Sequence, residues 1–252
     1  MTYILDLPAH QDNALPNVVS AIMVVQSHCN FQPSVLALLA QQHVREVIIV
    51  NASAFALCAA NLAEFARAHP KCHVVPCAAN AGLVAAYNQG IQYATCQFLL
   101  FVAQGCILPL QTVSKMLLTG AYKPGPWMVS VGNKDMKPTA EVSLLGGGRH
   151  VPFVCPQCFL VPTKVFLALD GFDPHCFHST FHLDLSMRVH LAGGGVYAIN
   201  EMQESDAKPK SLREKWQALK GWVHYYRKYL GNQTKIARWF QFTADLVKHS
   251  FR

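Results

Sequence analysis

The feature that most constrains the fold is a series of short apolar runs separated by segments with helical spacing. "AIMVV" (21–25) is a continuous apolar run, as expected of a strand buried on both faces, and "EVIIV" (46–50), which is apolar after Glu46, is a second such segment. Between them, Leu38 and Leu39 follow Val35 by three and four residues. This spacing predicts a helix, so the region is a strand, helix, strand unit.

The same alternation continues along the chain. We predict a helix near 54–68, a strand at 73–76, a helix at about 82–95 and the strand "FLLFV" at 98–102. Strands that alternate with helices at this spacing predict an α/β fold with a mostly parallel sheet and helices on both faces. In such sheets, ligands bind beyond the carboxyl ends of the strands.

The remaining segments predict where this domain ends. Further elements are expected as a helix near 110–120, a strand at 127–132, a helix at 181–192 and a strand at 196–199. A glycine run at 193–195 ends the last of these helices, and "ESDAKPKS" (204–211) is typical of a linker. We therefore expect one α/β domain over residues 1–203 and a helical extension over 204–252.

The extension carries the positive charge of the chain. From Lys208 onward, eleven Lys or Arg face Glu214 and Asp245, a net of +9, so residues 1–207 sum to −2 in a chain of total charge +7. Three interpretations stay open for residues 208–252: an amphipathic hairpin packed on the body, a peripheral contact with an anionic membrane, or nucleic-acid binding. Nucleic acid is the least favoured, because no recognised binding motif is present.

Composition and the N-terminus indicate the compartment. Hydrophobic residues make up 52% of the chain and charged residues 14%, values typical of a globular protein. The first ten residues do not resemble a signal peptide, and no stretch reaches the roughly 18 to 20 apolar residues that span a bilayer. Nine cysteines, an odd number, suit reduced thiols better than a disulfide framework. We expect a cytoplasmic protein; a peripheral contact with the inner face of the membrane is the alternative that stays open.

Several segments, in order, resemble those of a known enzyme family. "NAGLVAAYNQGI" (80–91) is similar to the pattern N-x-G-x-x-x-A-x-N-x-G, and "FLLFVAQGCILP" (98–109) to a strand that carries a D-x-D motif. "FLVPTKVFLALDGFDPHCF" (159–177) is similar to a segment ending in G-G-F-D, and "FHLDLSMRVHLAGGGVYAI" (181–199) to an E-D-x-D-L-x-x-R helix and its following strand. Over about residues 20–200 the chain thus resembles the family 2 glycosyltransferases of the GT-A fold, especially rhamnosyltransferase-like members.

The resemblance implies a function and a donor pocket. It implies transfer of a sugar from a nucleotide diphosphate sugar to a glycan or lipid-linked acceptor, with inversion. The positions that match the donor-side segments of the family, together with one available cation, are Gln26, Ser27, Asn51, Ser53, Asn80, Gly82, Gln104 and Arg149.

The chain departs from the family at its acidic positions. The aspartate that contacts the nucleobase is replaced by Val50, and the D-x-D pair by Ala103 and Gly105. Hard divalent cations need oxygen ligands, usually with a carboxylate, so a metal-bridged diphosphate is not expected here. No cofactor is predicted, and the negative charge of the donor must be met by backbone amides, helix N-termini or cationic side chains.

The catalytic base of the family is also replaced. Phe181 and His182 stand where the family has its E-D pair, while Asp184 and Arg188 remain. A neutral histidine can act as a general base near pH 7, so His182 is the candidate base and Asp184 its candidate support. The alternative for His182 is a packing or surface residue, and for Asp184 an ion pair with Arg188 four residues later.

Two rival interpretations stay open. Cys155, Cys158, His178 and His182 form the ligand set of a structural zinc site, although the 19 residues between the pairs exceed the usual finger spacing. The loss of three acidic functions is also what a non-catalytic descendant of the fold would show. Such a protein would bind a sugar, a nucleotide or a partner, or form an oligomer whose second subunit supplies the missing groups.

Overall fold

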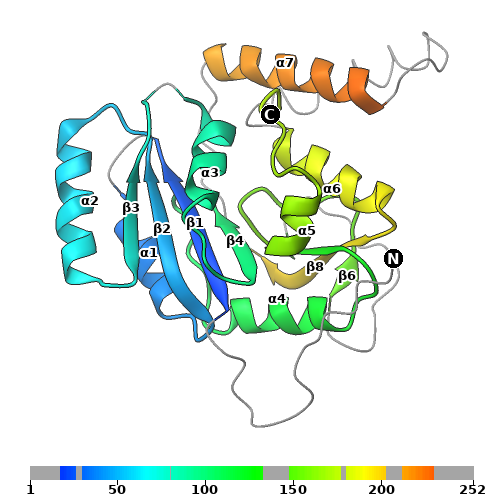
Figure 1. The fold of residues 1–252 in the computed structure, drawn as a ribbon, viewed down its shortest axis with the longest axis horizontal. Coiled ribbons are helices and arrows are strands. Elements are labelled where there is room, and N and C mark those ends of the chain that lie inside the picture. Colours follow the sequence, from blue (N-terminus) through cyan, green and yellow to red (C-terminus); the bar gives the residue numbers. More distant parts are fainter. Residues whose placement is uncertain are drawn as a thin grey trace.

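A single mixed sheet forms the centre of the computed structural model, which describes residues 18–26, 30–79, 81–132, 148–176, 180–202 and 212–229. The strands lie in the order β3-β2-β1-β4-β7-β5-β8-β6 (Figure 1). They are β1 (Val19–Val25), β2 (Val44–Asn51), β3 (Cys72–Pro76), β4 (Phe98–Val102), β5 (Trp127–Gly132), β6 (Arg149–His150), β7 (Cys158–Pro162) and β8 (Gly195–Met202). The helices are α1 (Gln32–Leu39), α2 (Ala56–Ala68), α3 (Leu83–Ile91), α4 (Thr112–Ala121), α5 (Thr163–Ala168), α6 (Phe181–Leu191) and α7 (Leu212–Tyr229).

The first half of the sheet is parallel, as the alternation of strands and helices predicts. β1 pairs with β2 on one side and with β4 on the other, and β2 pairs with β3. In this register Val25 lies opposite Asn51, and Met23 lies opposite Val102. The carboxyl ends of β1, β2 and β4 therefore meet at one edge of the sheet.

The second half is mixed rather than parallel. β7 runs antiparallel to both β4 and β5, and β6 runs antiparallel to β8, so only four of the seven strand pairings are parallel. The α/β class is confirmed, while the predominance of parallel pairing holds only for the first half. The sequence does not indicate this direction, because β7 is buried on both faces in the same way as the parallel strands.

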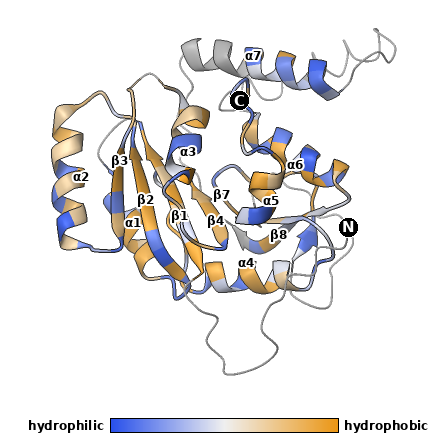
Figure 2. Ribbon diagram, viewed as in Figure 1, coloured by the Kyte–Doolittle hydropathy of each residue, from blue (hydrophilic) through white to orange (hydrophobic). Residues whose placement is uncertain are grey.

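The core consists of two apolar layers, one on each face of the sheet. Along β1, Ala21, Met23 and Val25 face the layer that holds residues of α1, α2 and α4. Ile22 and Val24 face the layer that holds residues of α3, α5 and α6. Figure 2 shows the central strands as the hydrophobic part of the molecule. The apolar runs were thus correctly interpreted as strands covered by helices on both sides.

Glycines fix two features of this packing. A Cβ on Gly90 of α3 would lie 2.6 Å from Cγ2 of Val50, so the helix approaches β2 closely only because this position has no side chain. Gly193 has a φ of +75° and ends α6, and the N–H of Gly194 donates to the carbonyl of Val189. This is the left-handed helix end that the glycine run predicts.

The helix predicted in the extension is present as α7. It lies along one end of the molecule, next to α6 (Figure 1). Tyr225, on the face of α7 that packs on the body, is 7% exposed. The rest of the predicted extension, residues 204–211 and 230–252, lies outside the described residues. Within the described part of the chain, no helix combines the length and the apolar character needed to cross a bilayer.

Candidate active site

The carboxyl ends of β1 and β2 bring together three of the predicted donor residues. Gln26 directly follows β1 and is exposed, and Asn51 is the last residue of β2. The side-chain carbonyl of Asn51 accepts a hydrogen bond of 3.2 Å from the N–H of Ser53, and the Ser53 hydroxyl accepts one of the same length from the N–H of Phe55. These bonds hold the Asn51 and Ser53 side chains at the edge where ligands of α/β sheets bind.

The N-terminus of α3 supplies backbone donors at the same edge. Gly90, near the end of this helix, lies beside Ile48 and Val50, and the hydroxyl of Tyr87, in the middle of the helix, donates to the carbonyl of Val102 at the end of β4. Gly82, the N-cap, has a φ of +81°, and a Cβ added to it would have no protein atom within 4 Å. Gly82 has no side chain to cap the first N–H groups of α3, and an uncapped helix N-terminus favours an anion.

The end of β4 is a tight turn. The N–H of Ala103 donates to the carbonyl of Gln157 at 2.7 Å, and the N–H of Gly105 donates to the hydroxyl of Ser34 at 3.1 Å. Gly105 has a φ of +88°, a conformation that favours glycine. The turn is therefore fixed by backbone bonds, and Gln104 between the two positions is partly exposed.

This turn does not suit a divalent cation. Ala103 and Gly105 have no side-chain oxygen, and Gln104 offers one neutral amide oxygen. Among the described residues, one group of three acidic, histidine or cysteine side chains lies close enough to share an ion, and it consists of Asp173, Cys176 and His224, away from β4.

His182 lies in the first turn of α6. The ring of its neighbour Phe181 packs 5.9 Å from that of Tyr87, whose hydroxyl contacts the end of β4. The carbonyl of His182 accepts a 2.7 Å hydrogen bond from Ser186, and the Ser186 hydroxyl accepts one from the N–H of Val154. These contacts fix the first turn of α6 on the side of the sheet that carries α3, with the His182 side chain partly exposed.

Asp184 lies in the same turn of α6, two residues after His182, and is completely buried. Its Oδ2 accepts hydrogen bonds of 2.9 and 2.6 Å from Nε and Nη2 of Arg188. Its Oδ1 accepts one of 2.6 Å from Tyr229 and lies 2.8 Å from Nζ of Lys228. The ion pair with Arg188 that the spacing predicts is confirmed, but it is buried and it is shared with α7.

A second aspartate, Asp173, also binds α7. Asp173 lies 2.7 Å from Nζ of Lys228 and 3.1 Å from Nε2 of His224, and it accepts hydrogen bonds from the N–H and the ring of His175. Burial alone would raise the pKa of Asp173, but the hydrogen bonds from Lys228, His175 and His224 outweigh it and hold this pKa well below its usual range. The carboxylate therefore stays charged.

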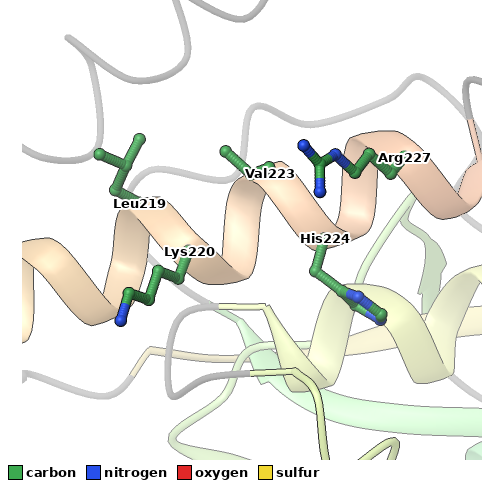
Figure 3. A pocket seen from close by; sticks show the side chains of 5 residues that line it. All are labelled: Leu219, Lys220, Val223, His224 and Arg227. Carbon is green, nitrogen blue, oxygen red and sulfur yellow. The ribbon is translucent and has the colours of Figure 1, made fainter.

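Other predicted residues lie apart from this edge or outside the described part of the chain. Arg149 is on β6, five strand positions from β1, so it does not join Gln26 and Asn51. Ser27, Asn80 and the zinc candidate His178 lie outside the described residues. An open hollow of about 390 Å³ along α7 contains none of the predicted donor residues; its described lining is Leu219, Lys220, Val223, His224 and Arg227 (Figure 3).

Three residues with a clear role in the structure were missed from the sequence. Asp173, Lys228 and Tyr229 were not among the candidates, although Asp173 is the aspartate of the "GFD" segment. That segment was the available signal for Asp173. Nothing in the local sequence signals Lys228 and Tyr229, which meet Asp173 and Asp184 only through the fold.

Part of the sequence matches a known protein family. Residues 22–119, from β1 to α4, match the family model described as "Glycosyl transferase family 2". The resemblance to family 2 glycosyltransferases is confirmed. The matched family 2 segment contains Gln26, Asn51, Ser53, Gly82 and Gln104. No protein of curated function matches the sequence significantly.

Solved structures of glycosyltransferases share the fold. GalNAc-T7 with UDP, GalNAc and Mn²⁺ superposes with a TM-score of 0.63 at 13% identity, over 91% of this chain and 55% of its own. The mannosyltransferase PcManGT from Pyrobaculum calidifontis, in complex with GDP-Man and Mn²⁺, gives 0.60 at 12%, over 92% and 80%. TarS from S. aureus, residues 1–349, gives 0.56 at 13%, also over 92% and 80%. The fold is thus of the GT-A type, and the chain spans about half the length of GalNAc-T7.

Proposed function

We propose that this protein is a glycosyltransferase that binds a nucleotide diphosphate sugar at the carboxyl ends of β1, β2 and β4. The single observation that carries the proposal is the convergence of Gln26, Asn51, Ser53 and the N-terminus of α3 at this edge of a GT-A sheet. Amide and hydroxyl groups are suited to the nucleoside part of such a donor, and the N–H groups at the start of α3, after Gly82, to its phosphates.

The diphosphate would be bound without a metal at the D-x-D position. Ala103 and Gly105 supply no carboxylate, so the charge of the donor would be balanced by the N–H groups of α3 and by nearby cations. Binding of the donor is therefore expected to depend little on Mn²⁺.

We assign the general base to His182. It would accept the proton of the acceptor hydroxyl while that oxygen attacks the anomeric carbon, and the nucleotide diphosphate would leave with the electron pair of the glycosidic bond. Such direct displacement inverts the anomeric centre. Asp184 would act as a positioning residue, since its contacts to Arg188 and Tyr229 fix the helix that carries His182.

The acceptor is proposed to be a glycan or a lipid-linked saccharide. The net charge of +9 beyond residue 207 supports a peripheral contact of residues 208–252 with an anionic membrane, where a lipid-linked acceptor would reside. We place the protein on the cytoplasmic side of that membrane.

Donor binding can be tested with a panel of UDP-, GDP- and dTDP-sugars, by thermal shift and calorimetry, in Mn²⁺ and in EDTA. We expect at least one donor to bind with similar affinity in both, and Asn51→Ala to weaken that binding. Asn61→Ala, at a partly exposed position on α2, is the matched control. A response only in Mn²⁺, or none to any donor, would contradict the proposal.

A non-catalytic binding protein is the second candidate. It is favoured by the replacement of the family's acidic residues at Val50, Ala103 and Gly105, and by the complete burial of Asp184. Turnover of a bound donor separates the two. Transfer that is lost in His182→Ala but kept in His190→Ala, a partly exposed histidine on the same helix, supports the enzyme, whereas donor binding with no turnover supports the second candidate.

A further inference from the structure

We propose that Asp173, Cys176 and His224 form a zinc site that fastens α7 to the body of the protein. The carboxylate, thiol and imidazole donor atoms of these residues all lie within 4.8 Å of one another. The first two belong to the loop after α5, and His224 belongs to α7 (Figure 3). None of these three residues belongs to the proposed donor site, and they are distinct from the two cysteines and two histidines that the sequence left open as a rival interpretation.

The geometry is close to that of a bound ion. Zinc binds oxygen, nitrogen and sulfur ligands at about 2.0 to 2.3 Å in a tetrahedron, which places ligand atoms roughly 3.3 to 3.8 Å apart. Oδ2 of Asp173 and Nε2 of His224 are already 3.1 Å apart. Figure 3 shows the His224 side chain directed from α7 toward the body, opposite to Leu219 and Val223. Small movements of the three side chains would complete three of the four ligand positions.

The donor set selects the metal. A mixture of one thiolate, one imidazole and one carboxylate suits zinc, whereas magnesium and calcium prefer oxygen ligands alone. Ionised Asp173 and Cys176 would together balance the charge of Zn²⁺. The ring of His175 stacks 5.5 Å from that of His224 and its side chain is 76% exposed, so His175 or a water molecule is available for the fourth position.

Without the ion, the same groups form a different network. Lys228 lies 2.7 Å from Oδ2 of Asp173, the oxygen nearest His224, so zinc and the ammonium group compete for this atom. Lys228 keeps its second partner, Oδ1 of Asp184, when the ion binds. Cys176 is buried, and its thiol must release a proton to the solvent when it binds zinc, because the thiolate is the form that binds the metal.

Metal analysis of the full chain, purified without chelators, tests the site. We expect one zinc per chain, and at least a tenfold loss of affinity, by competition with a chromophoric chelator, in both Cys176→Ser and His224→Gln. Cys77→Ser and His73→Gln are the matched controls and should keep the ion. Lys228→Met, which removes the competitor, should bind zinc at least as tightly as the natural chain.

Two further readouts keep the test decisive. Replacement of zinc by Co²⁺ should give a thiolate-to-metal charge-transfer absorption that Cys176→Ser abolishes, and zinc should slow hydrogen exchange over 212–229. His224→Gln changes only α7, so it reports on the site even if Cys176→Ser fails to fold. No bound zinc, zinc kept by both ligand variants, or zinc lost in Cys155→Ser but kept in His224→Gln would overturn the proposal.

Discussion

The hydroxyl of Tyr229 donates a hydrogen bond of 2.6 Å to Oδ1 of Asp184, a carboxylate with no exposed surface. The two residues are 45 positions apart, one near the end of α7 and the other in the first turn of α6. Burial and this hydrogen bond to Asp184 raise the pKa of Tyr229 well above its usual value, so the phenol remains a donor throughout the physiological range. The buried carboxylate of Asp184 thus joins the candidate catalytic helix to the basic extension, through Tyr229 and also through Lys228.

Removal of that hydroxyl should loosen α7. Tyr229→Phe deletes a hydrogen bond to a charged acceptor, for which we expect a loss of about 1.5 to 3 kcal/mol in the free energy of unfolding. Urea denaturation measures the loss, and hydrogen exchange locates it in 212–229. Tyr93→Phe, at a side chain that is 53% exposed, is the control and should change stability by less than about 0.5 kcal/mol. Equal effects of the two variants would contradict the structural role of the contact.

Neutralisation of Asp184 should be more costly. Asp184→Asn keeps the shape of the side chain but leaves Arg188 and Lys228 without their shared counter-charge, a change that costs about 3 to 5 kcal/mol in buried ion pairs. Thermal and urea denaturation provide the measurement. Asp170→Asn is a suitable comparison, because Asp170 is exposed and its φ of +60° is one that asparagine tolerates. A cost below about 1 kcal/mol for Asp184→Asn would show that the cluster contributes little.

The pKa of Asp173 predicts an acid-sensitive contact with α7. Because the folded pKa is depressed, Asp173 contributes stability that is fully present above its unfolded pKa of about 3.9 and is lost as the pH falls through the folded value. In EDTA, the free energy of unfolding of the natural chain should therefore fall more steeply below about pH 4 than that of Asp173→Asn. Parallel curves for the two proteins would disprove this linkage.

The raised pKa of Lys228 predicts that its contribution to stability is lost at high pH, the opposite of the dependence for Asp173. Burial would lower its pKa, but the hydrogen bonds to Asp173 and Asp184 outweigh this and raise it, so its contribution is present below the unfolded pKa of about 10.4 and is lost as the pH rises through the folded value. Protection of the α7 amides should decrease at alkaline pH in the natural chain and less so in Lys228→Met. Hydrogen exchange, corrected for the intrinsic effect of pH, checks this difference.

Close packing of α3 on the sheet gives a prediction for the donor edge. A Cβ at Gly90 would lie 2.6 Å from Val50 and 3.1 Å from Ile22, so Gly90→Ala should overpack the core and cost about 1 to 3 kcal/mol, despite the higher helix propensity of alanine. Ala85→Ser adds one atom on the exposed face of the same helix and should be nearly neutral. If Gly90→Ala were as stable as the natural chain, the position of α3 against β2 would be wrong.

The sequence predicted the central elements well because their signals are local. The wholly apolar runs at 21–25, 47–50 and 98–102 lie within β1 and β2 and coincide with β4. The direction of β7 was not predictable, since a strand buried on both faces has the same pattern whether it is parallel or antiparallel to its neighbours. The helix predicted over 82–95 ends earlier, at Ile91, in the structure.

The candidate site, too, was predicted from the sequence only in part. The order of residues placed Gln26, Asn51, Ser53 and Gly82 at strand ends or a helix start, and parallel pairing of β1 with β2 then brings their segments to one edge. Arg149 was proposed as a nearby cation. Its distance from the ends of β1 and β2 depends on the strand order, and β6, which carries Arg149, lies at the opposite end of the sheet. Ser34 was missed because its hydrogen bond to Gly105 joins residues 71 positions apart.

The sequence by itself determined the strand and helix periodicity, the absence of carboxylates at Ala103 and Gly105, and the pairing of Asp184 with Arg188, because each depends on residue types or on spacing along one element. The tertiary structure alone decided that Asp184 is buried and that Tyr229 and Lys228 reach it. The physical reason is that burial and long-range hydrogen bonds depend on how α7 packs against α6, and no local sequence pattern encodes this packing.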